Sequence, residues 1–245
     1  MVFSQLSTAA TLLSFITATF LPNSHALATG QRLTGRAVAT GVYITQCYVP
    51  GQVALTFDDG PGIYTEELLD TLAAYGAQVT FFVNGYNLAG NEWLLRRIVN
   101  EGHQLASHTQ DHADLTTLGY DQIVAQMSTL ESAIVDAVGV APRYMRPPYL
   151  AIDDYVLGVL GDLDFRVIGA SVDTKDYEND DPNLIGNSIA KFNQELDQGG
   201  TIVLSHDTHE QTVRTLAPTM LEELAQRGLT AVTVGECLGD DAVYR

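Results

Sequence analysis

Basic side chains are scarce in this chain. Its 245 residues include 12 lysines and arginines against 30 aspartates and glutamates, which gives a formal net charge of −18. A surface of that sign repels the phosphates of nucleic acids and of anionic lipids. The composition therefore predicts that neither nucleic acid nor a membrane surface is a partner of the mature protein. An acidic surface of this kind suits a neutral or cationic substrate.

The chain also lacks an apolar run long enough to cross a bilayer comfortably. A largely apolar segment, residues 9–21, precedes the first charged side chain, Arg32, and leads into the small-residue pattern Ala26-Leu27-Ala28. This layout is typical of a secretory signal cleaved after Ala28, with an uncleaved anchor as the alternative. We predict a signal peptide at residues 1–28 and one mature domain at residues 29–245. That domain is expected to be a monomer, secreted to the extracellular space or the cell wall.

Cysteine is nearly absent as well. The only two cysteines, Cys47 and Cys237, lie near opposite ends of the expected mature domain. An even pair in a secreted protein favours a disulfide, with two buried free thiols as the alternative.

Short apolar segments alternate with amphipathic ones along the rest of the chain. The expected strands are residues 53–57, 79–83, 104–107, 144–146, 165–169, 201–204 and 230–232. The expected helices are residues 66–75, 93–101, 120–138, 153–160, 182–196 and 212–227. Glycines at the ends of these helices, as C-terminal caps, are Gly76, Gly102, Gly139, Gly161 and Gly228. Seven strands with six intervening helices predict an α/β fold with a parallel sheet in a single domain, either open or closed as a barrel.

Two adjacent carboxylates, Asp58 and Asp59, follow the first expected strand and precede Gly60 and Pro61. An ordinary Asp-Asp-Gly turn is one interpretation. The other is a site, because two like charges this close cost free energy unless a cation offsets them or one keeps a proton. The loops that follow parallel strands gather at one edge of the sheet, where such folds place their sites.

Two histidines follow the third expected strand. His108 and His112 are four residues apart, so one helical turn would direct both imidazoles to the same ion. A solvated helix face is the alternative for this spacing alone. A carboxylate at the same sheet edge favours a shared metal with two histidine ligands and one aspartate, which leaves positions open for water and suits catalysis.

Five segments together resemble the polysaccharide deacetylases, carbohydrate esterase family four, and the secreted fungal chitin deacetylases most of all. They are Thr56–Pro61, Ser107–His112, Arg146–Tyr149, Asp173–Tyr177 and Ile202–His206, and their order and approximate spacing match over about residues 51–234. The resemblance implies a distorted parallel (β/α) barrel of about seven strands and a catalytic domain at residues 29–245.

The resemblance also assigns roles residue by residue. It implies one divalent metal, zinc before cobalt, on Asp59, His108 and His112. It makes Asp58 the general base, Arg146 the residue that orients the base, and His206 the general acid. Asp176 is the carboxylate that tunes the acid, with Asp173 as a weaker candidate. The backbone N–H of Tyr149 is implied as the oxyanion donor, Leu204 as part of the acetyl pocket, and Tyr177 as an aromatic wall where many relatives have tryptophan.

The expected activity is hydrolysis of the N-acetyl group of N-acetylglucosamine units in chitin or chitooligosaccharides, releasing acetate. Within the same family, an acetylxylan esterase and a peptidoglycan deacetylase are alternatives. A catalytically silent carbohydrate-binding protein is a third. The presence of Asp58, Arg146 and His206 disfavours it, because a silent relative is expected to lose its base or its acid.

Overall fold

The structure is a computed structural model that describes residue 1 and residues 38–245. Apart from Met1, the expected signal peptide lies outside the described residues and stays a prediction. Among the described residues, no helix is long and apolar enough to cross a membrane.

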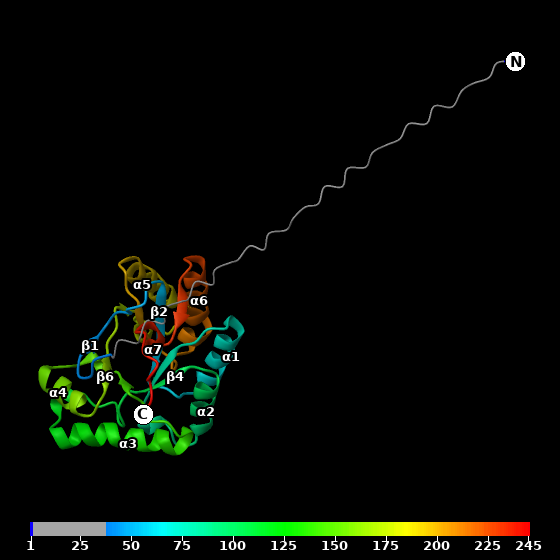
Figure 1. The fold of residues 1–245 in the computed structure, drawn as a ribbon. Helices are drawn as coiled ribbons and strands as arrows, with labels where there is room; N and C mark the ends of the chain where they lie inside the picture. Colours follow the sequence, from blue (N-terminus) through cyan, green and yellow to red (C-terminus); the bar gives the residue numbers. More distant parts are fainter. Residues whose placement is uncertain (2–37) are drawn as a thin grey trace. The chain divides into compact units, whose positions relative to one another are not determined.

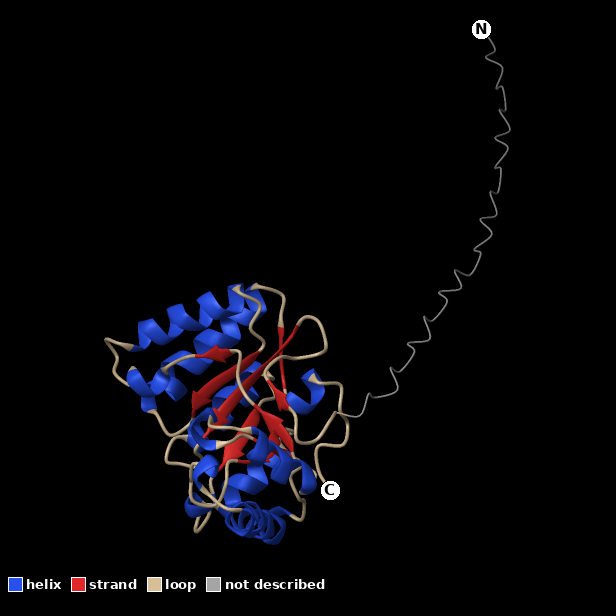
Figure 2. Ribbon diagram, turned by 90° about the vertical axis from the view of Figure 1, so that its left-hand side faces the viewer, coloured by secondary structure: helices blue, strands red, loops and turns tan. Residues whose placement is uncertain are grey.

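One parallel sheet forms the centre of the domain, with helices outside it (Figures 1 and 2). Its strands are β1 (Tyr43–Ile44), β2 (Gln52–Asp58), β3 (Thr80–Val83), β4 (Gln104–Ser107), β5 (Tyr144–Met145), β6 (Arg166–Ile168), β7 (Val172–Asp173), β8 (Ile202–His206) and β9 (Thr230–Val232). The strand order is β1-β6-β5-β4-β3-β2-β8-β7, and β9 also pairs with β2. The expected distorted barrel in a single domain is therefore confirmed. The seven expected strands are all present, and β1 and β7, two residues each, were not anticipated.

The helices follow the expected ranges closely. They are α1 (Thr65–Tyr75), α2 (Glu92–Asn100), α3 (Tyr120–Val138), α4 (Asp154–Asp162), α5 (Ile185–Asp197), α6 (Ala217–Gln226) and the unexpected short α7 (Val234–Cys237). Short 3-10 turns, η1 (Gly85–Asn87), η2 (Leu115–Thr117), η3 (Pro148–Leu150) and η4 (Asp176–Glu178), occupy loops, and a π-helical turn, η5 (Thr212–Leu216), precedes α6.

One predicted helix cap was wrong. Gly161 lies inside α4 and does not have positive φ; the left-handed residue after this helix is Asp164, at φ 61°. Gly161 is needed for a different reason: a Cβ on Gly161 would lie 3.2 Å from the Cα of Gly41, and one on Gly41 would lie 2.9 Å from the Cα of Gly161. The two glycines let the segment before β1 approach α4 closely.

Alternate side chains of β2 face opposite sides of the sheet, as the pleat requires. Val53, Leu55 and Phe57 belong to the core shared with the outer helices, whereas Ala54 belongs to the interior cluster around Phe82. Asp58 has the same parity as Ala54 and is only 2% exposed. The pleat therefore directs a carboxylate into the barrel interior at the end of its central strand.

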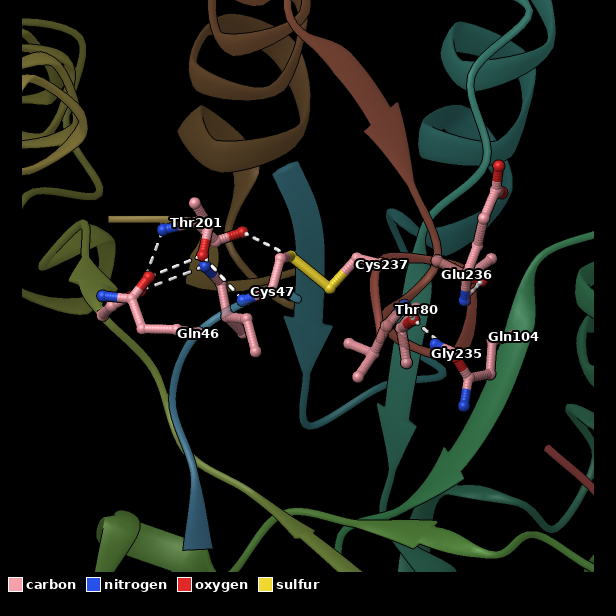
Figure 3. The surroundings of a disulfide bond; sticks show 12 residues. Gln46, Cys47, Thr80, Gln104, Thr201, Gly235, Glu236 and Cys237 are labelled. Carbon is pink, nitrogen blue, oxygen red and sulfur yellow. Dashed lines mark hydrogen bonds between the residues drawn. A yellow bond between two sulfur atoms is a disulfide. The ribbon is translucent and has the colours of Figure 1, made fainter. Parts of the chain in front are cut away.

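The C-terminal segment of the chain lies beside the starts of β3 and β4 (Figure 3). Cys47 and Cys237 form the expected disulfide, with their Cα atoms 5.0 Å apart. At the start of α7, the backbone N–H groups of Val234 and Gly235 donate to the side chains of Thr80 (2.9 Å) and Gln104 (2.8 Å). These contacts lie at the end of the strands opposite to their carboxyl ends.

Candidate active site

A cavity of about 460 Å³ opens at the carboxyl ends of the strands. It is lined by Asp58, Asp59, His108, His112, Pro147, Tyr149, Leu150, Asp173, Lys175, Tyr177, Leu204, His206 and His209. Most of the residues singled out in the sequence line it directly. Parallel pairing explains the gathering, because β2, β3, β4 and β8 all end at this edge.

Asp58 is held by a fully buried arginine. Arg146 Nη1 donates to Asp58 Oδ1 at 2.8 Å and to Thr56 Oγ1 at 2.6 Å, while Nη2 donates to the carbonyl of Gly169 at 2.9 Å. The guanidinium also stacks on Phe82, 4.3 Å from the ring centre. Burial raises the pKa of Asp58, and Arg146 opposes that rise. The hydrogen bond from Arg146 thereby fixes the orientation of the Asp58 carboxyl group.

Asp59, His108 and His112 converge on one point. Asp59 Oδ1 lies 3.6 Å from His108 Nε2 and 3.3 Å from His112 Nε2, and all three ligand atoms lie within 4.8 Å of one another. His108 Nδ1 hydrogen-bonds the carbonyl of Arg146 at 2.7 Å, which directs Nε2 to the cavity. Burial lowers the pKa of His108 to about 3, so its ring is neutral and offers a lone pair.

The chemistry of these three groups fits a divalent metal. Asp59 Oδ1 is buried and accepts no hydrogen bond from the described residues, although it faces two imidazole nitrogens. Ligand atoms around one tetrahedral zinc at about 2.0–2.1 Å lie about 3.3 Å apart, close to the observed separations. Two histidines and one carboxylate would leave coordination positions free for water and substrate.

His206 and Asp58 lie side by side at the ends of β8 and β2, because they are register partners on these paired strands. Its Nδ1 lies 2.8 Å from Asp176 Oδ1, and the other oxygen of Asp176 accepts from the His206 backbone N–H and from Thr212. Burial alone would lower the pKa of His206, but Asp176, with help from Asp58 and Asp59, raises it to about 9. The ring is therefore protonated at neutral pH.

Asp176, and not Asp173, is the partner of His206. Asp173 instead accepts a hydrogen bond from the Tyr177 hydroxyl at 3.2 Å and lies 3.3 Å from Lys175 Nζ. Lys175 Nζ also donates to the Tyr177 hydroxyl at 2.5 Å. The Tyr177 ring meets the His206 ring edge to face, with centres 5.4 Å apart. The Tyr177 ring thus forms a wall of the cavity, and its hydroxyl is held by Lys175 and Asp173. Tryptophan has no hydroxyl and could not make both of these hydrogen bonds.

Tyr149 and Leu204 complete the cavity. Tyr149 has φ 59°, and its ring packs edge to face on His112 with centres 4.6 Å apart. Among the loop and turn hydrogen bonds of residues 38–245, none is donated by the Tyr149 backbone N–H to a backbone carbonyl. The N–H of the next residue, Leu150, donates to the carbonyl of Pro147. Leu204, on β8, presents an apolar surface that is 6% exposed.

The sequence placed Asp207 among the residues that follow the strand of His206 but assigned it no role. It is fully buried, and its Oδ2 accepts from Thr65 Oγ1 at 2.5 Å, which in turn accepts from the Gly62 backbone N–H at 2.7 Å. A Cβ on Gly60 would lie 2.4 Å from this carboxylate. Burial raises the pKa of Asp207 to about 7. The residue ties the loop after β2 to the loop after β8, and its position directly after His206 was the only signal available.

Comparison with known proteins shows the family to which the chain belongs. The sequence model of the polysaccharide deacetylase family matches residues 45–168. A chitin deacetylase from Pestalotiopsis sp is 47% identical over 207 residues, which cover 83% of this chain and 69% of the relative. A probable peptidoglycan-N-acetylglucosamine deacetylase from Arthroderma benhamiae is also 47% identical over 207 residues, but this chain spans about half of it, 47%.

Among solved structures, the chitin deacetylase from the fungal pathogen Colletotrichum lindemuthianum superposes with a TM-score of 0.82 at 45% identity. The match covers 85% of this chain and 97% of that one. The fold, the gathered strand-end residues and these similarities together lead to one conclusion: this chain belongs to the polysaccharide deacetylase family.

Proposed function

We propose that this protein hydrolyses the N-acetyl group of N-acetylglucosamine units in chitin or chitooligosaccharides and releases acetate. The observation that carries the proposal is the pairing of Asp58 and His206. A carboxylate held by Arg146 and a histidine held protonated by Asp176 are register partners beside one potential metal site. Amide hydrolysis needs both groups, because water must lose a proton and the departing nitrogen must gain one.

Asp59, His108 and His112 would hold one divalent ion, for which zinc is the first choice and cobalt the second. When bound, such an ion lowers the pKa of a water molecule toward about 7 and polarises an acyl carbonyl. The remaining steps belong to side chains and backbone groups of the protein.

Asp58 accepts the proton of the attacking water through the carboxylate oxygen that Arg146 leaves free. Arg146 binds Oδ1, whereas Oδ2 lies on the side of His108 Nε2, at 3.9 Å. The Tyr149 N–H donates to the oxyanion that develops on the acetyl carbonyl. His206 then gives its Nε2 proton to the nitrogen of the leaving sugar amine, and Asp176 stabilises the charged ring until that transfer.

The cavity walls fit an acetyl group attached to a sugar. Leu204 supplies apolar surface for the acetyl methyl, and Tyr177 supplies an aromatic face for a pyranose ring. The acidic surface would tolerate the cationic glucosamine units formed, so several deacetylations along one chain are expected. Crystalline chitin should react more slowly than soluble oligomers, since its acetamide groups are packed out of reach of a recessed site.

A peptidoglycan deacetylase is the second candidate, and the similarity to the Arthroderma benhamiae protein favours it. An acetylxylan esterase is a third, within the same family. The disulfide between Cys47 and Cys237 supports the proposal that the protein acts outside the cell. We further propose that it works as a monomer.

The deciding experiment measures acetate released by the zinc-loaded protein from chitotetraose, acetylxylan and peptidoglycan at equal concentrations of acetyl groups. Mass spectrometry of the oligomer products then counts the acetyl groups removed. The proposal predicts the highest kcat/KM on chitotetraose and products that have lost more than one acetyl group. Faster release from peptidoglycan or acetylxylan would contradict it.

A further inference from the structure

A second histidine lies in the cavity beside His206 and has no role in the proposed proton transfers. His209 lies in the turn after β8, where its backbone N–H donates to the carbonyl of His206 at 3.4 Å. Its ring meets the His206 ring edge to face, with centres 5.6 Å apart, and lines the cavity. The side chain is 28% exposed, so solvent or substrate can reach it.

The orientation of this ring is set by a carboxylate from a different loop. His209 Nδ1 lies 3.4 Å from Asp180 Oδ2, while Asp180 Oδ1 accepts from the backbone N–H of Gln211 at 2.8 Å. A carboxylate beside Nδ1 keeps the proton of the neutral ring on that nitrogen, which leaves a lone pair on Nε2. Within residues 38–245, Asp180 is the only acidic side chain that lies within 4.0 Å of the His209 ring nitrogens.

The position of His209 beside His206 determines which part of the substrate His209 can contact. His206 must approach the nitrogen that leaves with the sugar, so the sugar ring bearing that nitrogen lies on the His206 side of the cavity. Tyr177 and His209 both contact the His206 ring, at 5.4 Å and 5.6 Å between ring centres, and therefore flank that position. The sugar carbons next to the nitrogen-bearing carbon carry oxygen substituents, and Tyr177 and His209 are placed to contact these oxygens.

We propose that His209 is a sugar-binding residue whose Nε2 accepts a hydrogen bond from a hydroxyl of the substrate, and that Asp180 positions it. This inference rests on the proposed function in one respect, because it requires a sugar substrate. It adds a recognition contact that distinguishes a sugar acetamide from a simple acetyl compound.

The test uses three substitutions and two substrates. His209→Ala removes the ring, His209→Phe keeps the ring without its nitrogens, and Asp180→Asn removes only the charge that orients it. Glu210→Gln is the matched control: Glu210 is the next residue, pairs with Arg214 and Tyr64, and does not line the cavity. Chitotetraose is compared with 4-nitrophenyl acetate, which carries an acetyl group but no sugar hydroxyl.

The loss of one neutral hydrogen bond corresponds to an increase in KM of about three- to tenfold. We expect His209→Ala and His209→Phe to show that increase on chitotetraose, and Asp180→Asn to show a smaller one. Glu210→Gln should leave KM unchanged, and all variants should keep kcat/KM on 4-nitrophenyl acetate within about twofold of the parent.

Three results would overturn the inference. An unchanged KM in His209→Ala would show that the residue binds no part of the sugar. Parent-like behaviour of His209→Phe would assign the effect to the ring face instead of Nε2. A fall in kcat on chitotetraose with KM unchanged would mean that His209 acts through His206 and binds no part of the sugar, because the amide needs the acid and 4-nitrophenyl acetate hardly does.

Failure of the proposed function has a different signature. If the parent acts on acetylxylan or peptidoglycan instead, the proposed substrate is wrong, and the same variants measured on that polymer decide the role of His209. If no polymer releases acetate, calorimetric binding of chitotetraose to zinc-loaded Asp58→Asn protein, with and without His209→Phe, gives the answer. A three- to tenfold rise in Kd supports the contact, and an equal Kd excludes it.

Discussion

The two ends of the sheet differ in which residues adopt left-handed backbone: glycines such as Gly76 and Gly102 do so before the strands, and other residues do so after them. Seven non-glycine residues of the described chain have positive φ, and all but Asp164 lie in the loops around the cavity: Asp59, Thr109, His112, Tyr149, Leu150 and Lys175. The amino end instead carries the disulfide and α7, whose first N–H groups are hydrogen-bonded to Thr80 and Gln104.

Left-handed backbone costs free energy at residues other than glycine, and it persists only where surrounding contacts impose it. Here it occurs at the proposed metal ligands Asp59 and His112 and at the proposed oxyanion donor Tyr149, all of which line one cavity. The comparison teaches that one end of this barrel is built for stability and the other for chemistry. Substitutions at the two ends should therefore have separable effects.

The largest separable effect is expected at Asp58. Asp58→Asn keeps the side-chain shape but removes the proton acceptor, so kcat for acetate release should fall about 10²- to 10⁴-fold. Zinc affinity should change little, because Asp59, His108 and His112 are intact. Acetate assays with metal analysis of the purified variant measure both. A variant retaining more than a tenth of parental kcat would remove Asp58 as the base.

His206 should show its role through substrate chemistry and pH. His206→Ala should slow amide substrates more than acetyl esters, whose alkoxide leaving groups need less help from an acid. In the parent, His206 has a pKa of about 9, so the protonated acid is lost and activity declines as pH rises through that value. Asp176→Asn should move this alkaline limb to lower pH. Equal losses on amides and esters, or an unmoved limb, would argue against the assignment.

Substitutions at the amino end of the strands should lower the stability of the protein and leave its activity unchanged. Replacing both cysteines, Cys47→Ser with Cys237→Ser, should lower the free energy of unfolding by about 2–5 kcal/mol. Turnover at 25 °C should stay at the parental level, since the disulfide is at the opposite end of the strands from the cavity. Chemical denaturation and acetate assays on the same preparation test this. A large loss of kcat in the folded double variant would show that the two ends are coupled.

His103 offers a smaller effect with a defined pH window. Its buried Nδ1 accepts from the Val79 N–H at 3.2 Å, and burial lowers its pKa from 6.5 to about 4. Between these values the unfolded chain binds more protons than the folded one, so stability falls as pH falls from 6.5 toward 4. The loss from this residue should reach about 1–3 kcal/mol. His103→Gln should flatten that part of the stability profile in denaturation measured at several pH values; an unchanged slope would contradict the account.

The main elements were predictable because their signals are local. Apolar runs located seven strands, and residues next to their ends supplied the cavity. β1, β5 and β7 have two residues each, too short for any periodicity, and of these only β5 was predicted. η5 differs from an α-helix only in hydrogen-bond spacing. A glycine at position 161 is compatible both with a helix cap and with the close approach of another backbone, so the sequence could not distinguish these two roles.

The contacts that hold the site were less predictable than its members. Sequence placed Asp58, Asp59, His108, His112 and His206 at one edge, but only the family resemblance favoured Asp176 over Asp173 as the partner of His206. It also missed the link from Asp207 through Thr65 to Gly62. These pairings join loops about 30 to 140 residues apart, and only the three-dimensional register of β2, β7 and β8 brings them together.

The most direct test of the central claim is a metal titration followed by acetate release from chitotetraose. Chelator-stripped protein should be folded and inactive, and activity should rise with added zinc to a plateau at about one equivalent per chain. His108→Ala, which removes one of the three expected ligands, should require far more zinc to reach any activity. Full acetate release from the stripped protein, or a His108→Ala variant that titrates like the parent, would contradict a metal-dependent site built from Asp59, His108 and His112.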